Sequence, residues 1–184
     1  MNLLERDWRF DDPTSALSNI YAFIYFHLAK AVLEDYGDEG EKTLRRALIE
    51  YGHFRGNLLR ERHIAEGIEL NVKNFAEHYD LPTDKRTSKN RKLMTPLKSY
   101  GENSTCQFSD IWKLLEGIDQ DGETRIGRIY CEAFHQAMCE GYHPDMKIEL
   151  KRILTCGDER CCFLTTLPGA EACKECPERE IEET

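Results

Sequence analysis

The sequence has little basic charge and no long hydrophobic run. It contains 25 Lys and Arg against 34 Asp and Glu, for a formal net charge of −9. Phosphate binding needs a basic face, so this balance argues against a nucleic-acid partner. The stretch 1–13 has no apolar core of the signal-peptide kind, and the most apolar run, 20–32, is interrupted by His27 and Lys30 and is too short to cross a bilayer. We therefore expect a cytoplasmic protein that binds neither nucleic acid nor membranes.

The chain also lacks an internal repeat and a second Cys-x-x-Cys motif. Eight cysteines in a cytoplasmic protein indicate metal binding, catalysis or core packing before disulfides. One Cys-x-x-Cys is present, at Cys173 and Cys176, and zinc or an iron–sulfur cluster there would need a further ligand from Cys156, Cys161 or Cys162. The sequence does not decide between zinc and an iron–sulfur cluster. We expect a single domain over 1–168, followed by a Cys-containing acidic tail over 169–184.

The first half of the sequence predicts helices. Asp12 is a good N-cap before a run of helical spacing that ends at Gly37, and a second helical pattern covers 38–65. Within it, Gly52 and Gly56 clear one face of side chains. Two interpretations are open: close packing against another helix, which we favour, or room for a ligand.

The second half predicts a sheet around one central helix. That helix should begin near Gly122 and stop at Gly141, with its buried face marked by Ile126, Ile129, Tyr130, Ala133, Phe134, Ala137 and Met138. Strict alternation over 146–151, a turn at 157–160 and the stretch 161–167 predict a β-hairpin. The fold class is thus α+β, a helical N-terminal half followed by a small antiparallel sheet packed on the central helix.

The remaining segments predict shorter elements. We expect a short helix over 72–79, a strand over 104–108 and a helical turn or two over 111–118. The basic stretch 84–98 shows no clean period. It is read as a solvated connector, with a lid over an anionic ligand as the alternative.

A sulfur and imidazole stripe carries the chemical signal. Cys131, His135 and Cys139 recur every four residues, so they follow one line along the central helix. Neighbours in such a line can hold a metal, act as a thiol and its base, or form a half-buried packing stripe. For Cys139 we favour packing. Arg55 could hold a carboxylate, although an arginine on a helix is more often solvated or salt-bridged.

The second half resembles one known family. Tyr130-Cys131, the break Gly141-Tyr142-His143-Pro144 and the hairpin stretch Gly157-Asp158-Glu159-Arg160-Cys161-Cys162-Phe163 are similar to the L-2-amino-thiazoline-4-carboxylic acid hydrolase family. Cys106 matches the family's upstream strand cysteine. His135 and His143 depart from the aspartate and asparagine of its pattern. The closing motif is also similar to ligand-binding domains of the 4-vinyl reductase type.

The resemblance implies hydrolytic opening of a small cyclic amidine or thiazoline. In that reading Cys131 or Cys106 is the thiolate or its close partner, His135 is the base and Arg55 holds the substrate carboxylate. A metal-hydroxide mechanism through Cys106, Cys131 and His135 is equally compatible with the residue types. The alternative is a non-catalytic sensor domain that binds a small molecule or a metal. A homodimer is a general expectation.

Overall fold

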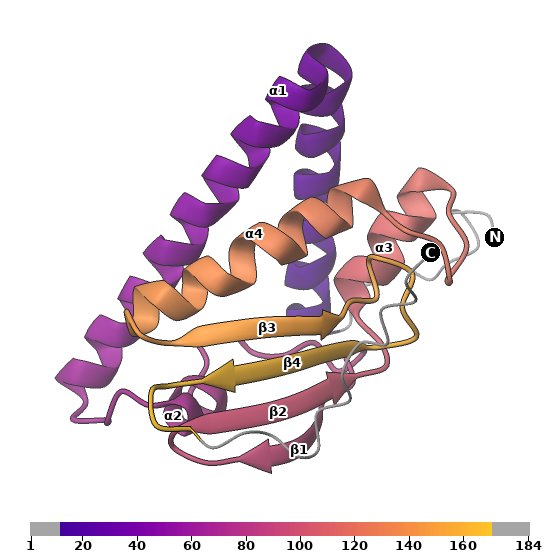
Figure 1. Ribbon diagram of the computed structural model, residues 1–184. Coiled ribbons are helices and arrows are strands. Elements are labelled where there is room, and N and C mark those ends of the chain that lie inside the picture. The colour runs from indigo at the N-terminus through magenta and orange to yellow at the C-terminus, as the bar shows by residue number, and fades with distance from the viewer. Residues whose placement is uncertain (1–11, 171–184) are drawn as a thin grey trace, which may run out of the picture.

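The computed structural model describes residues 12–170 as two layers, one of helices and one of strands (Figure 1). Cys173 and Cys176 lie outside the described residues. In chain order the elements are α1 (Pro13–Ala65), α2 (Val72–Glu77), β1 (Asn90–Met94), β2 (Lys98–Asn103), α3 (Gln107–Glu116), α4 (Arg125–Tyr142), β3 (Lys147–Arg152) and β4 (Cys161–Thr166). The predicted α+β class is confirmed.

Helix α1 is two helical arms joined at one glycine. Gly37 has φ 54° and ψ −125°, outside the helical region, so the chain turns there and the second arm runs back at an angle to the first, the two forming a V (Figure 1). The predicted start is also confirmed, because the Asp12 carboxylate accepts a hydrogen bond from the Ser15 amide at 3.0 Å and Pro13 takes the first turn. The helical half therefore begins and bends at the two residues that the sequence indicated.

Close packing explains the paired glycines in the second arm. A Cβ atom at Gly52 would lie 2.8 Å from the Phe134 carbonyl oxygen, and one at Gly56 would lie 2.3 Å from that of Met138. Both carbonyls belong to α4, so the two helices touch along their backbones. The packing interpretation is confirmed, and the glycines leave no room for a ligand.

The sheet has the order β1-β2-β4-β3, and all its pairings are antiparallel. The predicted hairpin forms its β3–β4 half, with Leu150 opposite Phe163. Strand β4 also pairs with β2, so Cys161 and Cys162 are central. They face opposite ways, as alternation requires: Cys162 joins Tyr100 and Leu164 in a small cluster separate from the main core.

The main core lies between α1, α3 and α4. All seven residues predicted for the apolar face of α4 are buried. Trp112 of α3 is fully buried against Tyr25 and Tyr130, with ring centroids 5.2 Å away in both cases, and its indole N–H donates to the Ala22 carbonyl at 3.1 Å. This aromatic contact fixes α3 and α4 against the first arm of α1.

Three local predictions were wrong or incomplete. The stretch 104–108 is not a strand, because β2 ends at Asn103 and Cys106 is the N-cap of α3. The basic stretch 84–98 is not only a connector, since it contains edge strand β1. Helix α4 begins at Arg125 behind the cap Thr124, a few residues after Gly122. Polar edge strands and capped turns show no strong hydrophobic period, which is why the sequence pattern missed them.

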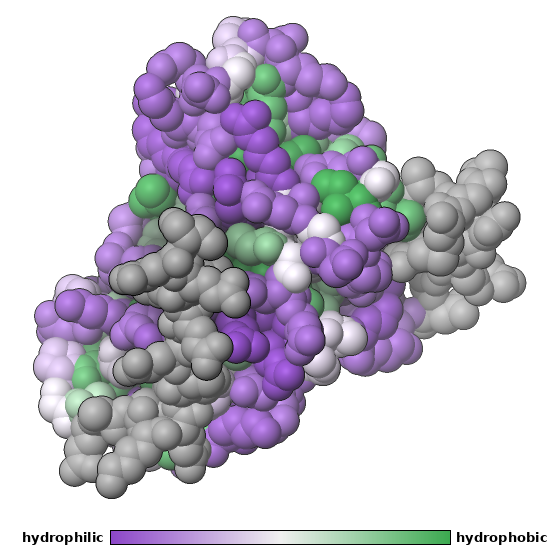
Figure 2. Space-filling view, turned by 45° about the vertical axis from the view of Figure 1, so that its right-hand side comes forward, coloured by the Kyte–Doolittle hydropathy of each residue, from purple (hydrophilic) through white to green (hydrophobic). Residues whose placement is uncertain are grey.

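Helix α1 also carries an exposed apolar line. Leu17, Ile20, Ile24 and Leu28 are between 49% and 62% exposed. By length and composition alone, α1 is long and apolar enough to cross a membrane. This is weak evidence for a span, because core helices of soluble proteins and signal sequences share these properties. On the face drawn in Figure 2, hydrophilic surface predominates and the hydrophobic areas are small and separate. The absence of a membrane partner stays a prediction.

Candidate functional site

A cavity of about 150 Å³ lies between α4 and the sheet. Helix α4 forms its roof, β2 and β4 form its floor, and α2 with β1 closes one side. The lining residues are Phe75, Ala76, Tyr79, Lys89, Asn90, Arg91, Ser99, Gly101, Asn103, His135, Met138, Cys139, Ile148, Phe163 and Thr165. A cavity of this size accepts a single small ring, since about 150 Å³ is enough for benzene.

Strand alternation builds the floor of this cavity. Ser99, Gly101 and Asn103 alternate along β2, and the register places Thr165 opposite Ser99 and Phe163 opposite Gly101. Gly101 has no side chain, so the floor is open beside the Phe163 ring. Mixed small polar groups and one aromatic ring give a surface that suits a small polar ring compound.

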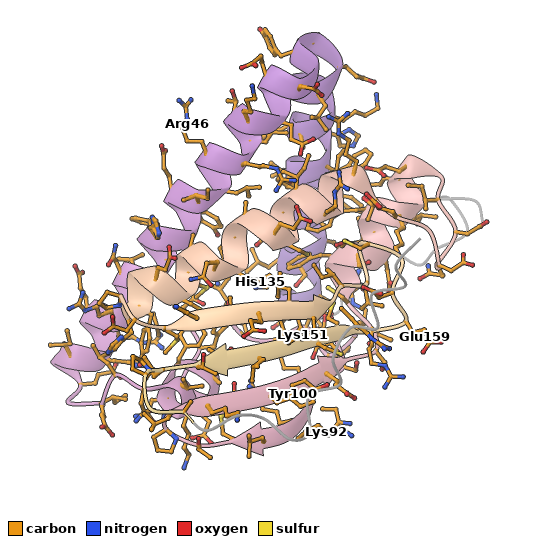
Figure 3. The ribbon with its side chains drawn as sticks, viewed as in Figure 1. Arg46, Lys92, Tyr100, His135, Lys151 and Glu159 are labelled. Atoms are coloured by element: carbon orange, nitrogen blue, oxygen red, sulfur yellow. The ribbon has the colours of Figure 1, made fainter. Side chains whose placement is uncertain are left out.

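His135 enters the cavity from α4 (Figure 3). Its ring contacts those of Phe134 and Phe163, with centroids 5.6 and 5.4 Å away. Loss of solvation, and secondarily the charge of Arg55, lowers its pKa from 6.5 to about 4. No hydrogen-bond partner for its ring nitrogens is found among the described residues. The site therefore presents a neutral imidazole whose nitrogens are available to a ligand.

Two cations stand at the side of the cavity. Lys89 donates a hydrogen bond to the Thr83 hydroxyl at 2.6 Å, and Arg91 donates to the Ala76 carbonyl at 3.3 Å. Both residues keep solvent exposure, yet desolvation lowers the pKa of each, and the charge of Arg91 adds to the effect on Lys89. Neither forms an ion pair within residues 12–170, although Glu77 partly offsets the effect on Arg91. This edge of the cavity is suited to an anion.

Cys139 lines the cavity one helical turn beyond His135. Its side chain is almost fully buried, and burial raises the pKa of its thiol to about 12. The neighbouring Met138 accepts a hydrogen bond from the Tyr79 hydroxyl at 2.9 Å, which fixes the aromatic wall against α4. The cavity thus holds a protonated thiol beside a neutral imidazole, in the helical spacing that the sequence showed.

The other two candidate thiols lie elsewhere. Cys131 and Cys106 do not line this cavity. Desolvation raises the pKa of both, and at Cys131 the charges of Cys161 and Cys106 add to the effect, so these three thiols form a neighbouring group. Cys161 accepts a hydrogen bond from the Leu154 amide at 3.3 Å. The structure brings Cys106 near enough to Cys131 for their charges to interact, but neither thiol lines the cavity that His135 enters.

Arg55 does not line the cavity either. Its guanidinium forms a two-point ion pair with Asp80 and is 10% exposed. Arg55 is therefore a salt-bridged arginine, the alternative that the sequence favoured. The pair is largely buried and not at the surface. Asp80 directly follows Tyr79, so the pair holds the cavity wall.

Metal binding finds no support in the described part of the chain. Within residues 12–170 there is no group of three or more His, Cys, Asp and Glu side chains that could hold an ion. The proposed set of Cys106, Cys131 and His135 is therefore not arranged as a metal site.

Sequence reasoning found His135 but missed several lining residues. Lys89 and Arg91 belong to the basic stretch. Their spacing of two would place both on one side of an extended chain, but it gives no sign of which element that side meets. Cys139 was noted and assigned to packing.

The described residues thus form an α+β domain with a cavity between a central helix and an antiparallel sheet. A family model described as L-2-amino-thiazoline-4-carboxylic acid hydrolase matches residues 18–164. The chain belongs to that family, whose name is that of a hydrolase. No curated protein matches the chain.

Proposed function

We propose that this protein is a hydrolase that opens a small ring bearing a carboxylate, and that the reaction takes place in the cavity between α4 and the sheet. The observation that carries the proposal is a neutral imidazole that has no hydrogen-bond partner within residues 12–170. It lines a cavity that fits one small ring, together with two partly desolvated cations. Membership of a hydrolase family supports the same reaction class. The bond opened is the ring C–N or C–S bond at the carbon between nitrogen and sulfur.

Lys89 and Arg91 hold the carboxylate in this proposal, in place of Arg55, whose guanidinium is taken by Asp80. His135 then lies over the ring. Its neutral form takes a proton from the attacking water, and returns it to the departing ring atom. The protonated thiol of Cys139 donates a hydrogen bond to the developing negative charge.

A direct attack by Cys131, with Cys106 as its partner, stays the alternative within the same reaction class. Desolvation raises the pKa of both thiols, so the thiolate would have to form during the attack. His135 is one helical turn from Cys131 on α4 and is the candidate base for this route. Comparing Cys131→Ala with Cys139→Ala separates the two routes: the water mechanism predicts the larger loss of kcat for Cys139→Ala, which removes the hydrogen-bond donor.

A non-catalytic binding module is the second candidate function. One observation favours it: the pKa values of Cys106, Cys131 and Cys139 are all raised, so none is an activated nucleophile in the resting protein. Such a module would use the same cavity and cations, and would bind the ring acid without opening it.

The test is turnover of L-2-amino-thiazoline-4-carboxylate and its ring analogues by the full-length chain, followed by mass spectrometry as the gain of one water. An enzyme should lose at least a hundredfold in kcat on His135→Ala, a typical contribution of a general base. His27→Ala is the matched control, because His27 is exposed on α1. Binding of these acids with no turnover by any of them would identify the binding module instead.

A further inference from the structure

The cavity lining contains positive and neutral side chains only. Of its fifteen residues, Lys89 and Arg91 are cations and His135 is neutral, while no aspartate or glutamate is among them. Asp80 is paired with Arg55, and Glu102 accepts a hydrogen bond of 2.9 Å from the Tyr100 hydroxyl. The charge of Glu77 acts on Arg91, but Glu77 does not line the cavity. The cavity lining itself therefore offers no negative charge to a cationic ring.

This composition matters for the ring of the ligand. A 2-amino-thiazoline ring carries a basic isothiourea group that readily takes up a proton, so its carboxylic acid is a zwitterion. Its carboxylate suits Lys89 and Arg91, but its charged ring would lie beside an imidazole and aromatic rings and near two like charges. A buried charge without a partner is unfavourable. The cavity therefore favours a ring without charge.

We infer that the substrate of this protein is a small monoanionic ring acid whose ring is uncharged, such as a cyclic thiocarbamate, rather than the zwitterionic amino-thiazoline. This inference rests on the proposed function and narrows its substrate class. The reaction stays balanced: water adds its oxygen to the ring carbon between nitrogen and sulfur, and one ring bond at that carbon breaks. The departing nitrogen or sulfur takes up the proton that His135 removed from the water, and the other proton of the water stays with the added oxygen.

His135 has a specific part in this selection. A carboxylate at that position would put a negative charge on α4, directly over the ring, and would pair with a cationic isothiourea. The imidazole, held between Phe134 and Phe163, offers a hydrogen bond and no charge. Residue 135 is thus the place where ring charge is discriminated.

The experiment compares two matched ring acids with the full-length protein. L-2-oxothiazolidine-4-carboxylate and L-2-amino-thiazoline-4-carboxylate share the five-membered ring and the carboxylate and differ at one exocyclic atom and in ring charge. Dissociation constants are measured by calorimetry and kcat/KM by mass spectrometry. We expect the oxo acid to be favoured at least tenfold in both. Raising the pH to deprotonate the amino ring should tighten its binding and leave that of the oxo acid unchanged.

The variant His135→Asp should reverse the binding preference by tenfold or more, while His27→Asp, which adds the same charge on an exposed part of α1, should leave it unchanged. Circular dichroism checks that both variants are folded, and the pH comparison needs no variant. Preferential binding and hydrolysis of the amino acid form by the wild-type protein would overturn the inference and leave the proposed function intact. Failure to bind or open either acid would overturn both.

Discussion

The guanidinium of Arg55 donates two hydrogen bonds to the carboxylate of Asp80, Nε to Oδ2 at 2.7 Å and Nη2 to Oδ1 at 2.6 Å. It also lies over the rings of Tyr51, Tyr79 and Phe134, with its Cζ atom 5.6, 5.7 and 5.1 Å from their centroids. Arg55 belongs to α1 and Asp80 to the segment after α2. This pair therefore joins the helical layer to the cavity wall.

Replacing Arg55 by alanine should lower the free energy of unfolding by about 3–5 kcal/mol, because Asp80 would be left largely buried without its partner. Asp80 is 18% exposed, so water can replace the guanidinium only in part. Arg55→Lys should recover part of the loss, since an ammonium cannot form the two-point contact or stack on three rings. Urea unfolding followed by circular dichroism measures the change.

The control for this substitution is Arg46→Ala on the same helical arm. Figure 3 shows Arg46 directed away from the rest of the molecule, and removing an exposed side chain changes stability by only about 0.5 kcal/mol or less. A similar fall in the free energy of unfolding for Arg46→Ala and Arg55→Ala would show that the ion pair with Asp80 does not stabilise the fold.

The contact between α1 and α4 gives a second stability prediction. In Gly56→Ala the new Cβ would lie 2.3 Å from the Met138 carbonyl oxygen and 2.7 Å from the Tyr142 nitrogen, so the helices must move apart. Overpacking of this kind costs about 1–3 kcal/mol. Asn57→Ala, one residue further along the arm and exposed, is the control. An unchanged unfolding midpoint for Gly56→Ala would contradict the observed backbone contact.

Much of this fold could be predicted from hydrophobic spacing, and the exceptions have a common cause. The buried face of α4 and the β3–β4 hairpin follow from periods of 3.6 and 2 because each buries one face. Strand β1 has no such signal, since Asn90, Arg91 and Lys92 are exposed at the sheet edge. Cys106 was misplaced because a cap before a helix and a short strand have the same extended backbone.

The site was only half predictable for a related reason. His135 could be found because its neighbours Cys131 and Cys139 share one helix and one spacing. Arg91 reaches the same cavity through the pairing of β1 with β2, which includes a bulge between Arg91 and Leu93, and Lys89 directly precedes that strand. Register and bulges depend on tertiary contacts, so no local pattern indicates which basic residues meet the imidazole.

The basic edge of the cavity gives a binding prediction. Lys89→Met and Arg91→Met should each raise KM about tenfold or more, because a hydrogen bond to a charged group contributes about 1.5–3 kcal/mol. The value of kcat should change little, since the carboxylate is held equally in the ground and transition states. Added salt should weaken binding to the wild-type protein more than to either variant.

Lys92→Met is the matched control for these two variants. Lys92 follows Arg91 on β1 but does not line the cavity, and Figure 3 shows it at the outer edge of the sheet. An equal rise in KM for Lys92→Met would indicate long-range attraction of the anion and not a contact in the cavity.

The low pKa of His135 predicts an unusual pH profile. Burial, with a smaller effect from Arg55, lowers the pKa to about 4, so the neutral imidazole persists through the mildly acidic range. If His135 is the base, kcat/KM should stay level down to roughly one pH unit above that value and then fall, because protonation removes the base. A decline already centred on the ordinary value of 6.5 would show that His135 is solvated or is not the base.

The low pKa of His135 should also make the free energy of unfolding fall as the pH is lowered. The unfolded chain takes up a proton on His135 near pH 6.5 and the folded protein only near pH 4, so the unfolded state binds more protons between these values. The contribution of His135 is therefore fully present above pH 6.5 and is lost as the pH falls toward 4. Relative to His135→Gln, the wild-type protein should lose stability over this window. His63, whose pKa is also lowered by burial, is present in both proteins and cancels in the difference. A constant difference between the two unfolding free energies across the window would place the imidazole in solvent and not in the cavity.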